Sequence, residues 1–256
     1  MVALDEPCPV SLFSPRESIP DALAQFIDTQ RRSLVDEGRA RAQVSDGDHA
    51  GKVPKLAPVL QRIPGRFGDQ LFNRWGARQT TDRMGWLRLA APVDEPFTLV
   101  VKQPAAFTAA LPQLAARFRC VALVRNPLAT LASWNTVDFK RDGRARVAER
   151  IDPTLGPRLD AIKNRYRRQM ELLSWFFERY RGHDLIRYEE MCWDPNETLS
   201  VVTPVDGLAP FESRNLNPKY SPYLIEKLAT LLLNSDGAYW EVYWREEVRR
   251  LAASYL

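Results

Sequence analysis

Three short apolar runs of the sequence end in side chains that can bind an anion. Lys102 follows the first run directly, Arg125 follows the second, and Arg187 and Tyr188 close the third. The carboxyl ends of parallel strands meet at the sheet edge where open α/β proteins bind their ligands. Cations at such ends therefore predict an anionic ligand, such as a phosphate group.

The second of these runs leads into a helix expected over residues 127–137. Asn126 is suited to cap this helix and Pro127 to occupy its first position. A helix N-terminus attracts anions because its amide groups and dipole point toward them. Ser133 lies eight residues after Arg125, so its hydroxyl is expected to donate a hydrogen bond to the same anion.

Hydrophobic periodicity predicts the elements that must position these residues. Buried strands are expected at 97–101, 120–124 and 184–188, and helices at 21–42, 107–117, 127–137, 157–181, 196–204, 222–234 and 238–255. Residues 1–20 are expected to be extended or looped and 43–70 to be irregular, while 71–92 is ambiguous and allows one or two short helices. Strands alternating with helices predict an α/β fold whose parallel sheet is covered on both faces.

Length and composition fit one globular domain covering 1–256, because 45% of the residues are hydrophobic and 27% are charged. The 36 basic and 32 acidic residues leave a net charge of +4, a mild excess consistent with an anionic partner. The basic residues are spread along the chain, so no nucleic-acid partner is expected.

Several classes of site are disfavoured by the sparse histidines and cysteines. Two histidines, and three scattered cysteines without ligand spacing, predict that no metal is bound. The odd cysteine count and the lack of a secretory pattern after Met1 predict a cytoplasmic protein. No apolar run reaches the roughly 20 residues of a membrane span, so no integral membrane segment is expected.

The strand ends resemble motifs of the sulfotransferases that use 3′-phosphoadenosine-5′-phosphosulfate (PAPS). Residues Val121–Pro127 with Ser133 resemble the segment that holds the 3′-phosphate of the nucleotide. Val101–Pro104 resembles the strand-end lysine segment, and Leu185–Pro195 resembles the family's Arg-Tyr-Glu segment. The three motifs occur in the family's order and separation, so the resemblance covers about residues 1–205.

The start of the chain resembles a bacterial branch related to the tyrosylprotein sulfotransferases. Val2–Pro7 is similar to the branch's second strand, which ends near an acidic residue proposed as the catalytic base. The resemblance assigns that role to Glu6. The aryl and steroid branch instead uses a histidine two residues after the lysine, and Pro104 stands at that position here.

The resemblance implies a three-layer α/β/α fold, similar to that of P-loop NTPases, and transfer of a sulfuryl group from PAPS to a hydroxyl or amine. Lys102 would stabilise the leaving nucleotide, 3′-phosphoadenosine-5′-phosphate, and no metal would be required. Cofactor contacts are implied for five residues: Arg125, Ser133, Tyr188, Arg214 and Lys219. The acceptor could be a small molecule, a glycan, a lipid or a peptide tyrosine.

One family feature is missing from the sequence. The Ser-Gly-Thr-Thr type loop that binds the 5′-phosphosulfate is expected before residue 2, together with a central strand. The chain is therefore expected to be an N-terminally truncated sulfotransferase domain, either because its start is assigned too late or because it is a remnant. The alternatives are a non-catalytic nucleotide-binding or partner-binding remnant, a P-loop kinase or nucleotidase relative, and a nucleic-acid-binding protein.

Overall fold

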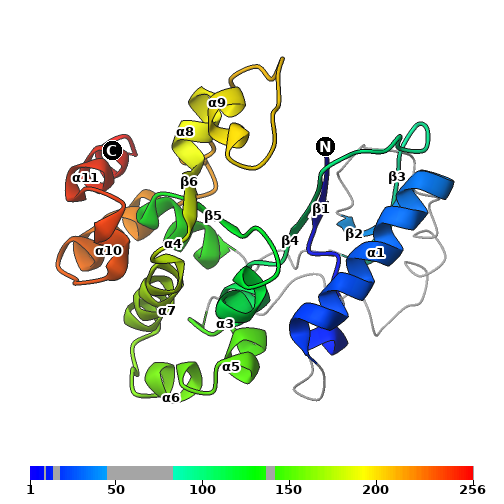
Figure 1. Cartoon of the computed structure of the whole chain (residues 1–256). Helices are drawn as coiled ribbons and strands as arrows, with labels where there is room; N and C mark the ends of the chain where they lie inside the picture. Colours follow the sequence, from blue (N-terminus) through cyan, green and yellow to red (C-terminus); the bar gives the residue numbers. More distant parts are fainter. Residues whose placement is uncertain (9, 14–17, 45–82, 137–141, 256) are drawn as a thin grey trace, which may run out of the picture. The chain divides into compact units, whose positions relative to one another are not determined.

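The structure is a computed structural model that describes residues 1–8, 10–13, 18–44, 83–136 and 142–255. The chain forms two compact units, Met1–Arg117 and Phe118–Leu256 (Figure 1). The first unit contains β1 (Val2–Asp5), η1 (Val10–Phe13), α1 (Ile19–Glu37), β2 (Arg39–Val44), β3 (Arg83–Arg88), β4 (Leu99–Lys102) and α3 (Pro104–Ala115). The second contains β5 (Val121–Val124), α4 (Pro127–Thr136), α5 (Arg146–Ile151), α6 (Leu155–Asp160), α7 (Arg165–Tyr180), β6 (Asp184–Arg187), α8 (Tyr188–Trp193), α9 (Pro195–Ser200), α10 (Pro222–Leu233), η3 (Ala238–Glu241) and α11 (Arg245–Ala253). The single domain expected over 1–256 stays a prediction beside these two units.

In the first unit, a parallel strand pair packs against a helix. β1 pairs with β4 in the register Val2↔Leu99 to Asp5↔Lys102. Apolar side chains of β1 pack with Leu34 of α1 and Ala40 of β2 in one buried cluster. This packing fixes the carboxyl ends of β1 and β4 side by side.

The first helix ends earlier than the periodicity predicted. Gly38 has a φ of 62°, and its N–H donates to the carbonyl of Leu34 at 3.1 Å, as in a helix C-cap. A β-carbon at Gly38 would lie 3.1 Å from the backbone of Ala91, so the turn also requires a close approach. The expected helix over 21–42 is therefore wrong at residues 39–42, which belong to β2.

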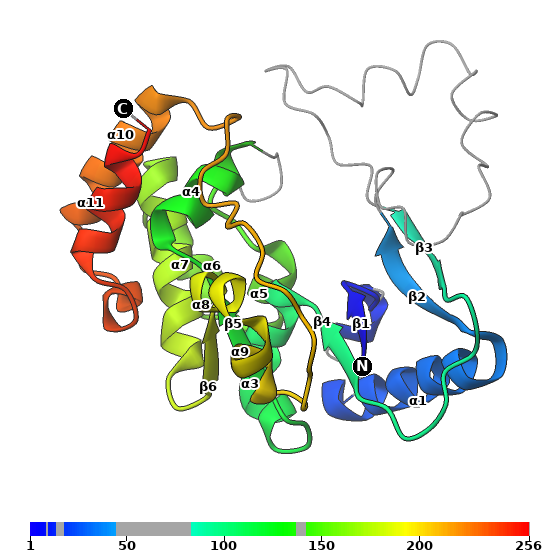
Figure 2. The same cartoon turned by 90° about the horizontal axis from the view of Figure 1, so that it is seen from above.

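β2 and β3 form an antiparallel ribbon, which Figure 2 shows extending from the end of α1. Its outer face carries Arg39 and Arg41, whose guanidinium groups stack on the Trp86 ring at 4.5 and 4.8 Å. The short helices allowed over 71–92 are thus wrong for residues 83–88, which are strand. The irregular connection expected at 43–70 is wrong at residues 43 and 44, which belong to β2, and the rest of it lies outside the described residues, as do residues 71–82.

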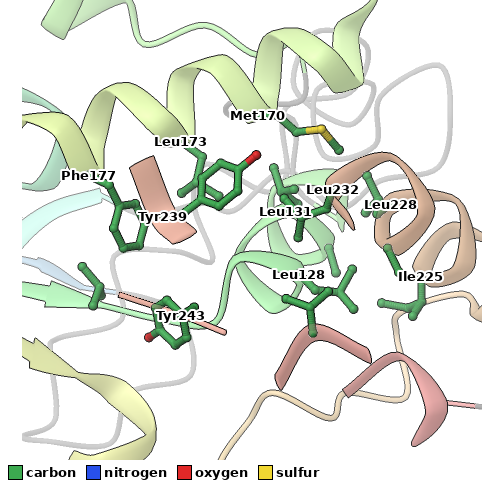
Figure 3. Packing of buried hydrophobic residues seen from close by; sticks show 14 of the residues in the cluster. Leu128, Leu131, Met170, Leu173, Phe177, Ile225, Leu228, Leu232, Tyr239 and Tyr243 are labelled. Carbon is green, nitrogen blue, oxygen red and sulfur yellow. The ribbon is translucent and has the colours of Figure 1, made fainter. Parts of the chain in front are cut away.

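The second unit is built on another parallel pair. β5 and β6 pair in the register Val121↔Asp184 to Val124↔Arg187. Leucines of α4 and α10, the inner side of α7 and two tyrosines near the C-terminus form its main buried cluster (Figure 3). The central positions are Leu128, Leu131, Met170, Leu173, Phe177, Ile225, Leu228, Leu232, Tyr239 and Tyr243. α4 is thereby held at the end of β5.

Two long helices expected from the periodicity are each divided in two. The helix expected at 157–181 is α6 followed by α7, because the Asn164 side chain accepts from the N–H groups of Tyr166 and Arg167 and starts a new helix. The helix expected at 238–255 is η3 followed by α11. Periodicity reports a continuous buried face and does not register such a break.

The helices expected at 127–137, 196–204 and 222–234 correspond to α4, α9 and α10 to within a few residues. The extended or looped segment expected at 1–20 is wrong at η1 and at the start of α1. The three predicted strands correspond to β4, β5 and β6, and the helix expected at 107–117 begins earlier, at Pro104. The protein is therefore a mixed α/β protein with small parallel sheets. Across the described ranges, no helix combines the length and apolar character needed to cross a membrane.

A buried carboxylate ties α5 to α7 and makes the stability of the second unit depend on pH. Asp152 accepts hydrogen bonds from Thr154, from Trp175 Nε1 at 3.1 Å and from Arg179. Burial alone would raise the pKa of Asp152, but these hydrogen bonds outweigh it and lower the pKa to about 2 from its ordinary 3.8.

We expect Asp152 to stabilise the fold fully above about pH 4 and to lose this contribution as the pH falls toward 2, because the unfolded chain then binds the proton more readily. Asp152→Asn should lower the free energy of unfolding at pH 7 by about 1–2 kcal/mol. Urea unfolding at pH 7 and pH 3 measures both effects. An equal loss for the variant at both pH values would contradict the assignment.

Candidate functional site

Glu6 and Lys102, the two residues assigned to catalysis, lie together at one end of the first unit. Lys102 is the last residue of β4 and is exposed. The Glu6 N–H donates to the Lys102 carbonyl at 2.7 Å, directly after the last strand pair, Asp5↔Lys102. Ninety-six residues of sequence separate them, and the parallel pairing brings them to adjacent strand ends.

Glu6 has a backbone φ of 41°, which an L-residue adopts at a cost. Such strain persists only where the surrounding structure imposes it, and it gathers at functional sites. We expect Glu6→Gly to be more stable than Glu6→Ala by about 0.5–1 kcal/mol, because both lose the carboxylate and only glycine escapes the β-carbon penalty. Denaturant unfolding of the two variants measures the difference, and equal stabilities would show that the turn relaxes.

The second unit has a pocket of about 500 Å³ at the carboxyl ends of β5 and β6. Its lining combines two cations, two aromatic rings and two apolar residues: Leu123, Val124, Arg125, Tyr188, Phe211 and Arg214. Leu123 and Phe211 are 50% and 45% exposed, so the apolar part is open to a ligand. This combination suits a ligand with an anionic group next to a flat ring.

The guanidinium of Arg125 is held on one edge and one face. Its Nε donates to Asn215 Oδ1 at 2.7 Å, and Nη2 donates to the carbonyl of Arg214. The Tyr188 ring lies 5.2 Å below the guanidinium carbon. The Tyr188 hydroxyl in turn accepts from the Arg214 N–H at 3.0 Å. Arg125 is therefore held by the end of β6 and by the loop between α9 and α10, which carries Arg214 and Asn215.

Glu189 connects the strand end, the loop and the C-terminal region. Its Oε1 accepts from the Asn126 N–H at 2.8 Å and from Asn215 Nδ2 at 2.7 Å. Its Oε2 accepts from the Tyr243 hydroxyl at 2.8 Å. Burial and the Glu189 carboxylate raise the pKa of Tyr243 far above its ordinary value, so the phenol keeps its proton.

The start of α4 is partly occupied by groups of the protein itself. Asn126 Oδ1 accepts from the Leu128 N–H at 3.0 Å, as the sequence predicted for a capping residue. Pro127 has no N–H, and the anion bound at this helix start is the Glu189 carboxylate. A ligand anion therefore depends on Arg125 rather than on the first amide groups of α4.

Of the five predicted cofactor contacts, Arg125, Tyr188 and Arg214 line the pocket together. Ser133 is half-buried within α4, and Lys219 is exposed in the segment between α9 and α10. Neither residue lines the pocket. Both assignments stay predictions.

Arg187, the third strand-end cation, is engaged within the protein. It pairs with Glu247, lies 3.6 Å from Glu190 and stacks on the Tyr243 ring at 4.4 Å. Lys102 and Arg125 end strands of separate pairs, because β4 pairs with β1 and β5 pairs with β6. Of the four polar residues singled out at the strand ends, Lys102, Arg125, Arg187 and Tyr188, the pocket lining includes Arg125 and Tyr188.

The cysteine thiols and the Tyr188 phenol are further reactive groups in the described part of the chain. Burial raises the pKa of the Cys8 thiol to about 12, so it is protonated at neutral pH. Burial also raises the pKa values of Cys120 and of the Tyr188 phenol. No group of three or more His, Cys, Asp and Glu side chains gathers within those residues in a way that could hold a metal ion.

Sequence reasoning missed the partners that hold Arg125. Asn215 lies in the loop between α9 and α10, and no local pattern marks a loop asparagine as the hydrogen-bond partner of an arginine 90 residues away. Phe211, a lining residue of the pocket, lies in the same loop and was also missed. Glu189 was part of the motif after β6, but its role was not recognised. The sequence does place the Glu189 carboxylate directly after Tyr188 at the strand end, and this position was the available sign that Glu189 belongs to the site.

Comparison with known proteins adds no assignment. The sequence matches no model of a known protein family, and neither the curated proteins nor the solved structures include a match to the chain.

Proposed function

We propose that the protein is a PAPS-dependent sulfotransferase, in which the pocket of the second unit binds the nucleotide. The pocket carries the proposal, because Arg125 and Arg214 supply charge for a phosphate next to the exposed Phe211 ring and the Leu123 side chain. A guanidinium binds an oxyanion with parallel hydrogen bonds, and aromatic rings stack on a base. The proposed fold is the three-layer α/β/α arrangement of P-loop-like sulfotransferases.

The proposed reaction moves a sulfuryl group in line from PAPS to an acceptor hydroxyl or amine. A bond forms between the acceptor atom and sulfur, and the bond from sulfur to the bridging oxygen of the phosphosulfate breaks. Glu6 accepts the acceptor's proton, and Lys102 stabilises the charge that develops on the leaving nucleotide. The backbone link between Glu6 and Lys102 keeps these two groups at neighbouring strand ends.

The acceptor is a hydroxyl or amine of a small molecule, glycan, lipid or peptide. The proposal needs neither a metal nor a nucleic acid, and its setting is the cytoplasm. The 5′-phosphosulfate loop of the family has no counterpart in the 256 residues.

A second function is a nucleotide-binding protein without turnover. It requires only the pocket, whose lining residues all belong to Phe118–Leu256. In this case the nucleotide would bind and no sulfuryl group would move.

Calorimetric titration of the full chain with 3′-phosphoadenosine-5′-phosphate tests binding, and release of this nucleotide from PAPS in the presence of a phenol and an amine acceptor tests turnover. Binding with turnover supports the sulfotransferase, whereas binding without turnover supports the second function. A chain that binds neither PAPS nor its product would overturn both.

A further inference from the structure

We propose that Glu189 and Asn215 are positioning residues that aim the terminal edge of the Arg125 guanidinium at the 3′-phosphate of the nucleotide. The inference rests on the proposed function and explains how its pocket would select a phosphorylated ligand. Neither side chain lines the pocket itself, and both act through Arg125.

The first step concerns which donors of Arg125 are left for a ligand. An arginine has five N–H groups on one rigid plane. The Nε–H is bound by Asn215 Oδ1, and one N–H of Nη2 is bound by the Arg214 carbonyl. The three other N–H groups lie on the two terminal nitrogens, and that edge can grip an oxyanion with two parallel hydrogen bonds.

The second step concerns the orientation of the Asn215 amide. Its oxygen must face Arg125, which only donates, and its nitrogen must face the Glu189 carboxylate, which only accepts. A flipped amide would turn its NH2 group toward the Arg125 N–H and its oxygen toward the Glu189 carboxylate. Asn215 is buried, so water would not satisfy these mismatched groups. Glu189 therefore fixes the one amide orientation that can hold Arg125.

The third step concerns what fixes Glu189. Its other contacts are the Asn126 N–H, next to Arg125 in the chain, and the protonated Tyr243 hydroxyl. The same carboxylate thus holds the backbone at the strand end and the loop that binds the side chain of Arg125. Any movement of the loop relative to β5 would break at least one of these hydrogen bonds.

The test compares two ligands that differ only in the 3′-phosphate, 3′-phosphoadenosine-5′-phosphate and adenosine 5′-phosphate. A loss of stability alone weakens the binding of both ligands by the same factor. The ratio of the two affinities is therefore insensitive to the folded fraction of a variant. We expect Asn215→Ala and Glu189→Ala each to lower this ratio at least fivefold. Glu189→Gln should retain it, because its oxygen still accepts from Asn126 and Asn215 and its amide can donate to the Tyr243 oxygen.

A double variant checks that the effect passes through Arg125. In an Arg125→Ala background, Asn215→Ala should change the affinity ratio by less than twofold. An unchanged affinity ratio in Asn215→Ala alone would overturn the inference. The inference would also be wrong if Asn215→Ala lowered the ratio as much in the Arg125→Ala background as in the parent.

A readout without nucleotide separates this inference from the proposed function. The Arg125 Nε–H, identified in NMR spectra by its loss in Arg125→Lys, should exchange slowly with water in the parent chain and rapidly in Asn215→Ala and Glu189→Ala. Slow exchange in the parent without binding of either ligand would overturn the proposed function but retain the positioning of Arg125. Equal exchange in the parent and both variants would overturn the positioning itself.

Discussion

Arg125→Ala is expected to weaken binding of 3′-phosphoadenosine-5′-phosphate by about 100-fold. Hydrogen bonds to a charged group contribute about 1.5–3 kcal/mol, which corresponds to roughly 10- to 150-fold in affinity. The geometry favours the upper part of that range, because Asn215, the Arg214 carbonyl and the Tyr188 ring hold the guanidinium before a ligand arrives. Calorimetric titration measures the change.

Two controls separate the loss of this contact from loss of charge or of folding. Arg119→Ala removes an exposed arginine of the same unit, which pairs with Asp184 at 3.7 Å, and should change the affinity by less than threefold. Binding of adenosine 5′-phosphate should fall far less than that of the 3′-phosphorylated ligand in Arg125→Ala. Equal losses for the two ligands would contradict a 3′-phosphate contact.

The sequence predicted the parts of the site that depend on short stretches of chain. Asn126 and Pro127 start α4 as expected, because capping uses groups only two residues apart. The strand ends at Lys102 and Arg125 were also found, since a short apolar run followed by a proline marks where a buried strand must stop. Interactions between residues close together in the sequence are sufficient to determine these features.

The parts that sequence reasoning could not find depend on distant partners. Glu189 contacts a backbone amide 63 residues away, and Asn215 contacts an arginine 90 residues away. The ribbon of β2 and β3 was missed for the same reason, because its pairing joins segments whose individual patterns are weak. No short window of sequence contains both members of such a pair.

A second kind of error concerns where elements end. The break between α6 and α7 depends on one asparagine side chain, Asn164, and the end of α1 depends on the positive φ of Gly38. Both residues were visible in the sequence, but each lay within or beside an apolar pattern that continued past it. Capping geometry overrides periodicity at these positions because it satisfies backbone groups that the pattern does not report.

Lys102→Ala is the variant for which the proposed reaction predicts the largest effect. Its ammonium would act on the charge that develops on the bridging oxygen, an interaction that strengthens only in the transition state. Removing one such donor lowers turnover by about 100- to 1000-fold in enzymes that stabilise an oxyanion. Single-turnover release of nucleotide from PAPS should therefore slow by this factor, while the affinity for 3′-phosphoadenosine-5′-phosphate changes by less than about fivefold.

The comparison of Lys102→Arg with Arg32→Ala makes this prediction specific. Lys102→Arg keeps a positive charge at the end of β4 and should recover part of the rate, whereas Arg32→Ala removes an exposed charge from α1 of the same unit and should have no effect. Arg125→Ala should lower affinity more than the rate at saturating PAPS, which is the reverse pattern. If Lys102→Ala instead weakened binding and left the saturated rate unchanged, Lys102 would be a binding residue, and the leaving-group role proposed for it would be wrong.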